Sequence, residues 1–185
     1  MAWTTPITFV TGQALTAAQL NTYLRDNSNF LFDPPMCCAQ ATANQTITTS
    51  TITDIAFAGA DLYDTDTMHN NVTNNTLIAP NTAGVYLFTA DVQYAGNATG
   101  TRYLNIQFDV GTFIIGNQSE LGPSGNPCRL SVSAYRNVVA TDIGNPTGQF
   151  TASTFQSSGA GLAIQGTTGG PAPCYFSAHW CGPAQ

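Results

Sequence analysis

Beyond residue 35 the sequence alternates between apolar and polar positions, which is the pattern of strands rather than helices. The clearest example is Gly84–Tyr94, whose even-numbered residues from Tyr86 onward are apolar or aromatic and fall on one face of a strand. Other segments of strand character are bounded by glycine, proline or asparagine; they cover residues 36–41, 47–58, 76–79, 101–110, 129–140, 149–156, 161–165 and 174–181. The pattern predicts an all-β head over residues 36–185, a jelly-roll sandwich of about eight to ten antiparallel strands.

Residues 1–35 differ from the head and form a second predicted region, an N-terminal docking arm followed by one short helix. The arm, residues 1–13, is predicted to be extended, with Trp3, Ile7 and Phe9 as its large apolar side chains. A segment this short cannot bury three such groups by itself, and large apolar side chains of this kind dominate many interfaces. We therefore expect the arm to dock on another protein.

The helix of this region is predicted over residues 17–30. Thr16 and Gln19 form a capping box at its start, and Asp33-Pro34-Pro35 ends it, because proline cannot continue a helix. Four residues spaced by four, three and four positions form a short seam along it: Leu20, Leu24, Asn27 and Leu31. One polar position in an apolar seam fixes register and strand number in coiled coils. We interpret the seam as an intermolecular contact; the alternative is an amphipathic helix packed on its own head.

Composition narrows the range of partners. Charged residues make up 8% of the chain, lysine is absent, and the formal net charge is −6. Four scattered arginines cannot form the basic patch that nucleic-acid phosphates require. No stretch approaches the roughly 20 apolar residues of a membrane span, and residues 1–13 lack the basic and apolar regions of a secretory signal. We therefore expect neither nucleic acid nor a membrane as a partner.

Candidate catalytic chemistry is scarce. The chain has two histidines, His69 and His179, and one glutamate, Glu120, and it contains neither a Gly-x-Ser-x-Gly elbow nor a phosphate-binding loop with lysine. We therefore expect no enzyme and no cofactor. The densest acidic cluster could offer oxygen ligands to calcium: Asp61, Asp64 and Asp66. Its spacing does not match an EF-hand loop, and we favour the alternative of a solvated loop in which aspartates form turns.

One motif resembles a known family. Ile78-Ala-Pro80 followed by Gly84-Val-Tyr86-Leu-Phe88 is similar to the Pro…Gly-x-Tyr-x-Phe signature of the complement and tumour-necrosis-factor jelly roll. The resemblance covers residues 36–181 and implies a compact homotrimer, in which the sheet holding the first and last strands faces the threefold axis. We expect five aromatic residues to divide between the core and this axis: Tyr86, Phe88, Tyr94, Phe176 and Trp180.

The N-terminal 30 residues resemble a different group. Trp3, Thr5-Pro6, the Thr16–Asn21 segment and Leu24-Arg25-Asp26-Asn27 are similar to the start of many small structural proteins of tailed bacteriophages. This resemblance implies a virion protein that is assembled in the host cytoplasm and lies on the outer surface of the particle. Its partner would be the major capsid protein or another virion protein.

Three functions are compatible with these resemblances. The first is a trimeric capsid decoration (head-fibre) protein anchored by its arm. The second is a tail-tip or short-fibre knob that recognises a host surface glycan through its head. The third, a glycan depolymerase, is disfavoured because the chain offers few acidic residues. A distal fibre usually has a long shaft, whereas only the short helix separates arm from head, so we favour the decoration protein.

The cysteines allow two outcomes. The jelly-roll resemblance implies that the first strand, near residues 36–41, pairs antiparallel with the last, which brings Cys37 or Cys38 near Cys174 or Cys181. One disulfide could then join the terminal strands, provided that the register brings the Cα atoms close enough. The alternative, which we favour, is five free thiols acting as small buried hydrophobic groups. Cys128 is expected to be free in either case.

Overall fold

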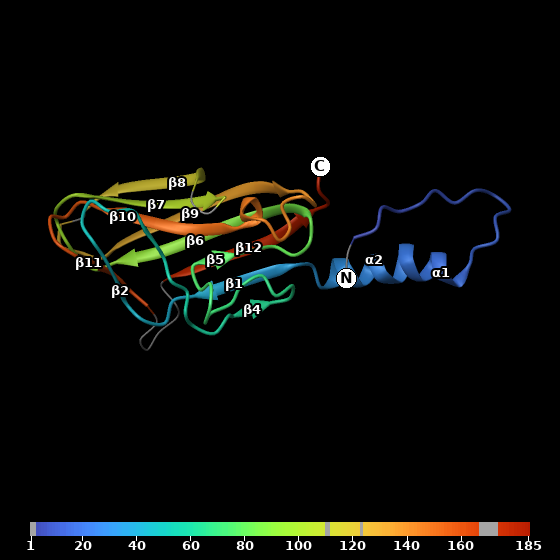
Figure 1. The fold of residues 1–185 in the computed structure, drawn as a ribbon, viewed down its shortest axis with the longest axis horizontal. Helices are drawn as coiled ribbons and strands as arrows, with labels where there is room; N and C mark the ends of the chain where they lie inside the picture. The colour runs from blue at the N-terminus through green and yellow to red at the C-terminus, as the bar shows by residue number, and fades with distance from the viewer. Residues whose placement is uncertain (1–2, 110–111, 123, 167–173) are drawn as a thin grey trace.

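The computed structural model describes residues 3–109, 112–122, 124–166 and 174–185. Two antiparallel sheets pack face to face, and a short helix with an arm projects from one end of the sandwich (Figure 1). The all-β jelly roll predicted from the alternation is confirmed. Within the described ranges, none of the helices has the length and apolar character that crossing a membrane requires.

The first sheet contains both terminal strands, and we call it the β1/β12 sheet. Its strands run in the order β2-β11-β6-β12-β1-β4, with β9 on the other edge of β6. The last strand, β12, therefore lies in the interior of the sheet, between β6 and β1. The bounds are β1 Met36–Gln40, β2 Gln45–Ile47, β4 Tyr63–Asp64, β6 Gly84–Tyr94, β9 Cys128–Val138, β11 Leu162–Ile164 and β12 Tyr175–Gly182.

The second sheet, which we call the β7/β10 sheet, has the order β3-β10-β7-β8, and β5 also pairs with β10. Its bounds are β3 Thr53–Asp54, β5 Leu77–Ile78, β7 Thr101–Phe108, β8 Phe113–Leu121 and β10 Phe150–Gln156. A 3-10 turn, Pro146–Gly148, precedes β10. Val110, the last residue of the strand predicted over 101–110, lies outside the described residues.

The core lies between the two sheets and is built by the alternation in their strands. The even-numbered residues of β6 point inward, and the ring of Phe88 stacks on that of Phe150 in β10 at 4.0 Å between centroids. Phe176 of β12 adds a ring 6.2 Å from Phe88. Burying each such side chain contributes roughly 1.5–3 kcal/mol, so these rings are a main source of head stability.

The segment predicted as one strand over residues 47–58 is interrupted, which corrects the sequence interpretation. Ser50 has a φ of 60°, a left-handed conformation that breaks extended backbone, and its N–H donates to the Gln156 carbonyl at 2.7 Å. On either side of it, β2 joins the β1/β12 sheet and β3 joins the β7/β10 sheet. The alternation of threonine and isoleucine therefore continues across a change of sheet.

The predicted helix is present, but its middle is not α-helical. The segment comprises α1 (Ala17–Leu20), the π-helix η1 (Asn21–Asp26) and α2 (Asn27–Phe32). Thr16 and Gln19 make both hydrogen bonds of the predicted capping box. A π-helix closes its hydrogen bonds one residue later than an α-helix, so it rotates everything after it relative to a regular helical wheel. Asn27, which follows the π-helix, is therefore rotated away from the position in the seam that an ideal helical wheel gives it.

The terminal strands pair as the resemblance implied, and their register leaves no cysteine opposite another. Cys37 lies opposite Ala178, and Cys38 lies opposite Ser177. All five cysteines are free thiols, and four of them are buried. Cys181 is exposed, so the interpretation of five buried groups is corrected at this residue. Cys128 is free, as expected.

Candidate functional site

The outer face of the β1/β12 sheet carries a hollow of about 730 Å³. It forms because residues on β1, β6 and β12 that alternate with the core positions point away from the sandwich, and the loop before β4 rises beside them. The hollow is lined by Cys38, Leu62, Tyr63, Leu87, Thr89, Tyr175, Ser177 and His179. Most of this lining is apolar or aromatic, and none of these residues is an aspartate, glutamate, lysine or arginine.

Polar groups in this hollow are paired with one another or kept neutral. The Tyr63 hydroxyl and the His179 Nε2 lie 2.8 Å apart. Burial, with smaller contributions from nearby groups, raises the pKa of Tyr63 to about 12, and burial also raises the pKa of the Cys38 thiol. Both groups are therefore uncharged at neutral pH. A neutral, mostly apolar concave face suits contact with another protein surface better than contact with water.

The five aromatic residues expected at the core and axis do not line this hollow. Tyr86, Phe88, Tyr94 and Phe176 are fully buried in the head core. Trp180 is half-buried at the end of the sandwich nearest the helix. The hollow is instead lined by the intervening residues of the same strands, among them Leu87, Tyr175 and His179. The alternation that identified the core face could have identified this opposite face.

A cluster of three aromatic rings joins the arm, the helix and the head. Phe30 packs edge-on against Trp180 at 4.7 Å, and Trp3 lies 6.2 Å from Phe30 and 6.4 Å from Trp180. The Trp180 indole N–H donates to the Ala83 carbonyl at 3.3 Å. A Cβ on Gly84 would lie 2.0 Å from the indole nitrogen, so glycine is required beneath this ring. Trp3 is thus part of the junction with the head.

Asn27 holds the start of the arm against the helix. Its Oδ1 accepts a hydrogen bond from the Thr4 N–H at 3.0 Å, and its Nδ2 donates to the Thr4 carbonyl at 2.7 Å. The residue is buried by these contacts. The amide predicted to lie in an intermolecular seam therefore faces the chain's own arm.

The three leucines of the predicted seam are exposed, as are other apolar residues near the tip of the arm. Leu20 is 39% exposed, Leu24 51% and Leu31 57%, so the chain itself does not cover them. Figure 1 shows the arm running beside the helix to its far end and turning there into α1. The arm turns at residues 10–13, where the Gln13 N–H donates to the Val10 carbonyl at 3.1 Å, and we call residues 9–13 the tip of the arm. Phe9 and Val10 are exposed there, whereas Ile7, before the tip, is half-buried.

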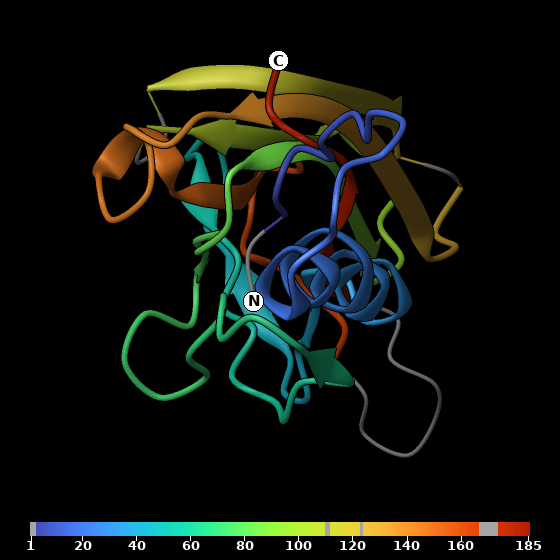
Figure 2. The same cartoon turned by 90° about the vertical axis from the view of Figure 1, so that its right-hand side faces the viewer.

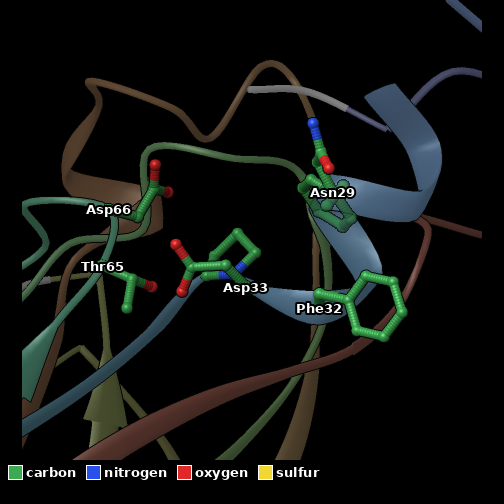
Figure 3. A pocket seen from close by; sticks show the side chains of 7 residues that line it. Asn29, Phe32, Asp33, Thr65 and Asp66 are labelled. Carbon is green, nitrogen blue, oxygen red and sulfur yellow. The ribbon is translucent and has the colours of Figure 1, made fainter. Parts of the chain in front are cut away.

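A smaller cleft of about 370 Å³ lies where α2 meets the head. Figure 3 shows the Asp33 side chain directed towards Thr65 and Asp66 across this cleft, with Phe32 at its edge. Burial raises the pKa of Asp66, although hydrogen bonds from Thr82 and Asn81 oppose the shift. The view along the long axis in Figure 2 shows the helix and the returning arm in front of the sandwich. The cleft therefore belongs to the junction between the helix and the head.

The three aspartates of the candidate calcium site do not converge. The Asp61 carboxylate lies 2.7 Å from His69 Nδ1, while Asp64 accepts hydrogen bonds from the Met68 and His69 backbone N–H groups at 2.9 Å each. No group of three potential metal ligands occurs in the part of the chain that the structure describes. Asp61 instead contacts the His69 ring, and Asp64 holds the backbone of the segment after β4.

Comparison with known proteins supports the fold. No protein-family model matches the sequence, and no curated protein matches it. The crystal structure of murine APRIL at pH 5.0 superposes with a TM-score of 0.55 at 8% identity, covering 80% of this chain and 98% of that chain. Murine APRIL at pH 8.0 gives 0.53 at 7% identity, with the same coverage of both chains. Eiger TNF from S. frugiperda gives 0.44 at 10% identity, covering 82% of this chain and 96% of that chain. The head therefore has a jelly roll of the tumour-necrosis-factor type.

Proposed function

We propose that this protein is a homotrimeric, non-enzymatic structural component of a bacteriophage particle, a capsid decoration protein that docks through its N-terminal arm. The observation that carries the trimer is the neutral, mostly apolar hollow on the outer face of the β1/β12 sheet. The jelly-roll family that the sequence resembles places the sheet with its first and last strands at the threefold axis. The same sheet carries the hollow in this chain.

The geometry of the helix supports the same assembly. β1 leads directly back to α2, and the helix extends from the end of the sandwich along its long axis (Figure 1). Three heads that met through their β1/β12 sheets would bring three helices side by side. Leu20, Leu24 and Leu31 are exposed on each chain and would be covered in that contact. In a closed threefold assembly, the outer face of each β1/β12 sheet and the leucines of each helix would all be in contact, and no copy of these surfaces would be left open.

A charge placed in the hollow tests the trimer. Leu87→Asp puts a carboxylate on the proposed interface, where trimer formation would take it out of water into a mostly apolar contact. We expect native mass spectrometry and sedimentation to find a trimer for the wild-type chain and a folded monomer for the variant. Leu121→Asp is the matched control, because Leu121 lies on β8 of the other sheet and is 74% exposed. It should remain trimeric. A monomeric wild-type chain, or a trimeric Leu87→Asp variant, contradicts the proposal.

Docking on the particle is assigned to the tip of the arm. The N-terminal sequence supports a phage origin through its resemblance to tailed-phage structural proteins, and Phe9 and Val10 are exposed at the tip. Trp3 is held at the head by Phe30 and Trp180, so it contributes to docking by fixing where the arm begins. The protein would then lie on the outer surface of the virion, with its head projecting outward.

The double substitution Phe9→Ser/Val10→Ser tests docking without disturbing the junction. Particles produced with this variant should lack the protein, although the purified variant should remain a folded trimer. Val72→Ser, at a residue 82% exposed in a head loop, is the matched control and should leave incorporation unchanged. A deletion of residues 2–13 should reproduce the loss. Normal incorporation of both arm variants would assign docking to the head instead.

The tail-tip knob remains the second candidate. It would share the fold and the trimer, but it also requires a ligand site on the face that a trimer leaves exposed. The hollow on the β7/β10 sheet favours this candidate, because its lining combines aromatic rings with amide groups.

A further inference from the structure

The outer face of the β7/β10 sheet has a hollow of about 340 Å³ that differs in chemistry from the one on the other sheet. It lies over β7, β8 and the end of β10, with the segment between β2 and β3 along one side. Its lining combines aromatic, aliphatic and amide side chains: Ser50, Ile52, Tyr103, Asn105, Ile114, Asn117 and Phe155. None of these residues is charged, so the hollow suits a neutral ligand.

Two aromatic rings form one wall. Tyr103 and Phe155 lie on neighbouring strands, directly opposite each other in the register, and their ring centroids are 5.4 Å apart. Their planes are tilted by 58° to each other, so each ring offers its own flat apolar face, and Tyr103 adds a hydroxyl at its edge. Ile52 and Ile114 are 60% and 55% exposed and extend the apolar rim. The wall therefore fits a ligand with a flat apolar face.

Two amides lie side by side in the same hollow. Asn105 and Asn117 face each other across β7 and β8, and the Asn117 Nδ2 donates a hydrogen bond to the Asn105 Oδ1. Each amide has one carbonyl acceptor and one NH₂ donor, so this bond leaves the Asn105 NH₂ and the Asn117 carbonyl for a ligand. An adjacent free donor and free acceptor match two neighbouring hydroxyls, one accepting and one donating.

The backbone at the side of the hollow is held in place. Ser50 has a left-handed φ of 60°, a strained backbone conformation for a residue other than glycine. The surrounding structure maintains it, because the Ser50 N–H is bonded to the Gln156 carbonyl. The side of the hollow is therefore preformed, and a preformed site loses less conformational entropy on binding.

We propose that this hollow is a binding site for a neutral saccharide. A pyranose ring presents a flat face of C–H groups to an aromatic wall and vicinal hydroxyls at its rim, and both features are matched here. In a trimer formed through the β1/β12 sheets, the β7/β10 sheet would face outward, so the site stays accessible. The site needs neither the trimer nor the particle, so its failure would leave the proposed decoration role unaffected and would remove only the observation that favours the tail-tip knob.

Saturation-transfer NMR on the full chain tests the site, with methyl α-D-glucopyranoside, methyl α-D-mannopyranoside and methyl β-D-galactopyranoside as probes. We expect transfer to the ring protons of at least one probe and shifts of the Asn117 side-chain amide signals. A printed array of neutral and sialylated glycans then ranks larger ligands. Asn117→Leu, at an exposed position, and Tyr103→Leu should each weaken binding by about tenfold, the effect of one lost hydrogen bond or ring contact.

Tyr135→Ala is the control, because it removes a tyrosine that is 68% exposed on β9, in the other sheet. It should bind the probes as the wild-type chain does. Circular dichroism melts of all variants separate lost binding from lost folding. If Tyr103→Leu does not fold, Asn117→Leu still tests the proposal. The proposal is overturned if no probe and no neutral glycan binds, if only sialylated glycans bind, or if the folded variants bind as the wild-type chain does.

Discussion

The head and the N-terminal segment treat their large apolar residues in opposite ways. The head buries an aromatic and aliphatic core between two sheets. In the segment, Phe30 alone among the described hydrophobic residues is buried. Seven of the fifteen large hydrophobic residues exposed in the described ranges belong to the first 32 residues: Phe9, Val10, Leu15, Leu20, Leu24, Leu31 and Phe32. The difference indicates that the head is stabilised by its own core, whereas the segment leaves its large apolar side chains exposed to solvent.

Helix length supports this division. The helical segment spans 16 residues, 17–32, and six of them are π-helical. Isolated helices of about 12–15 residues are marginal in water even in alanine-rich sequences, and this segment is only slightly longer and has six π-helical residues in its middle. The segment is held to the head by the Trp3, Phe30 and Trp180 cluster and to its own arm by Asn27. In the proposed trimer, further stability would come from neighbouring helices that cover the exposed leucines.

The largest expected contrast is between two phenylalanines. Phe88→Ala should lower the free energy of unfolding of the head by about 3–5 kcal/mol, because Phe88 is fully buried and stacked on Phe150. Phe32→Ala removes the same ring from a residue that is 88% exposed and should change it by less than about 0.5 kcal/mol. Urea denaturation followed by circular dichroism measures both. Equal effects would contradict the division between the two regions.

A second contrast concerns alkaline pH. Burial raises the pKa of the Cys174 thiol from 9.0 to about 12, and burial raises that of Tyr94 from 10.0 to about 12. Above pH 9 the unfolded chain loses these protons while the folded head retains them, so stability falls as pH rises from about 9 to 12. Each such group contributes a slope of roughly 1.4 kcal/mol per pH unit where only the unfolded state is ionised.

Thermal melts across this range measure the slope. Cys174→Ala removes one titrating group and should flatten the dependence between pH 9 and 12. Cys181→Ala, at an exposed thiol, is the matched control and should melt as the wild-type chain does at each pH. If the melting temperature of the head rose towards pH 11, ionisation of the buried Cys174 thiol would not be what controls the stability of the head in this pH range.

The sequence predicted the head where one periodicity dominated. Alternation in β6 identified the face that fills the core, and the jelly-roll resemblance implied the pairing of β1 with β12. The same reasoning missed β8, because this edge strand pairs with β7 alone and is largely exposed on both faces. Burial on one face creates alternation, and a strand without a buried face lacks that signal.

The candidate interfaces were less predictable, since they depend on contacts between distant residues. Capping-box chemistry gave the start of the helix, but no local pattern indicated the π-helical turn that directs Asn27 towards Thr4. Trp180 was expected at the core or the axis, and it reaches Phe30 and Trp3 because the chain places the helix at that end of the sandwich. Spacing along the sequence cannot encode such three-dimensional neighbours.

A third, smaller effect is expected at the contact between the arm and the helix. Asn27→Ala removes both hydrogen bonds to Thr4, each of which contributes about 0.5–1.5 kcal/mol. Hydrogen exchange at the Thr4 amide should accelerate by about tenfold or more, while exchange in β6 stays unchanged. Asn29→Ala, at an exposed asparagine on the same helix, is the control and should leave Thr4 protected. Unchanged exchange in Asn27→Ala would mean that the aromatic cluster alone holds the arm.

The smallest effect on the head, and the sharpest test of the comparison, is expected from the leucine seam. Substituting Leu20, Leu24 and Leu31 by serine removes exposed apolar surface, so the free energy of unfolding of an isolated head should change by less than about 0.5 kcal/mol. Trimer dissociation should instead occur at higher protein concentration than in the wild-type chain, because burial of each leucine contributes roughly 1.5–3 kcal/mol when a neighbouring helix covers it. Unfolding measured in the Leu87→Asp monomer, with and without the three serines, separates the two quantities. If the serines destabilise that monomer, the leucines pack on their own head, which is the alternative left open by the sequence, and the segment is part of the fold rather than an interface.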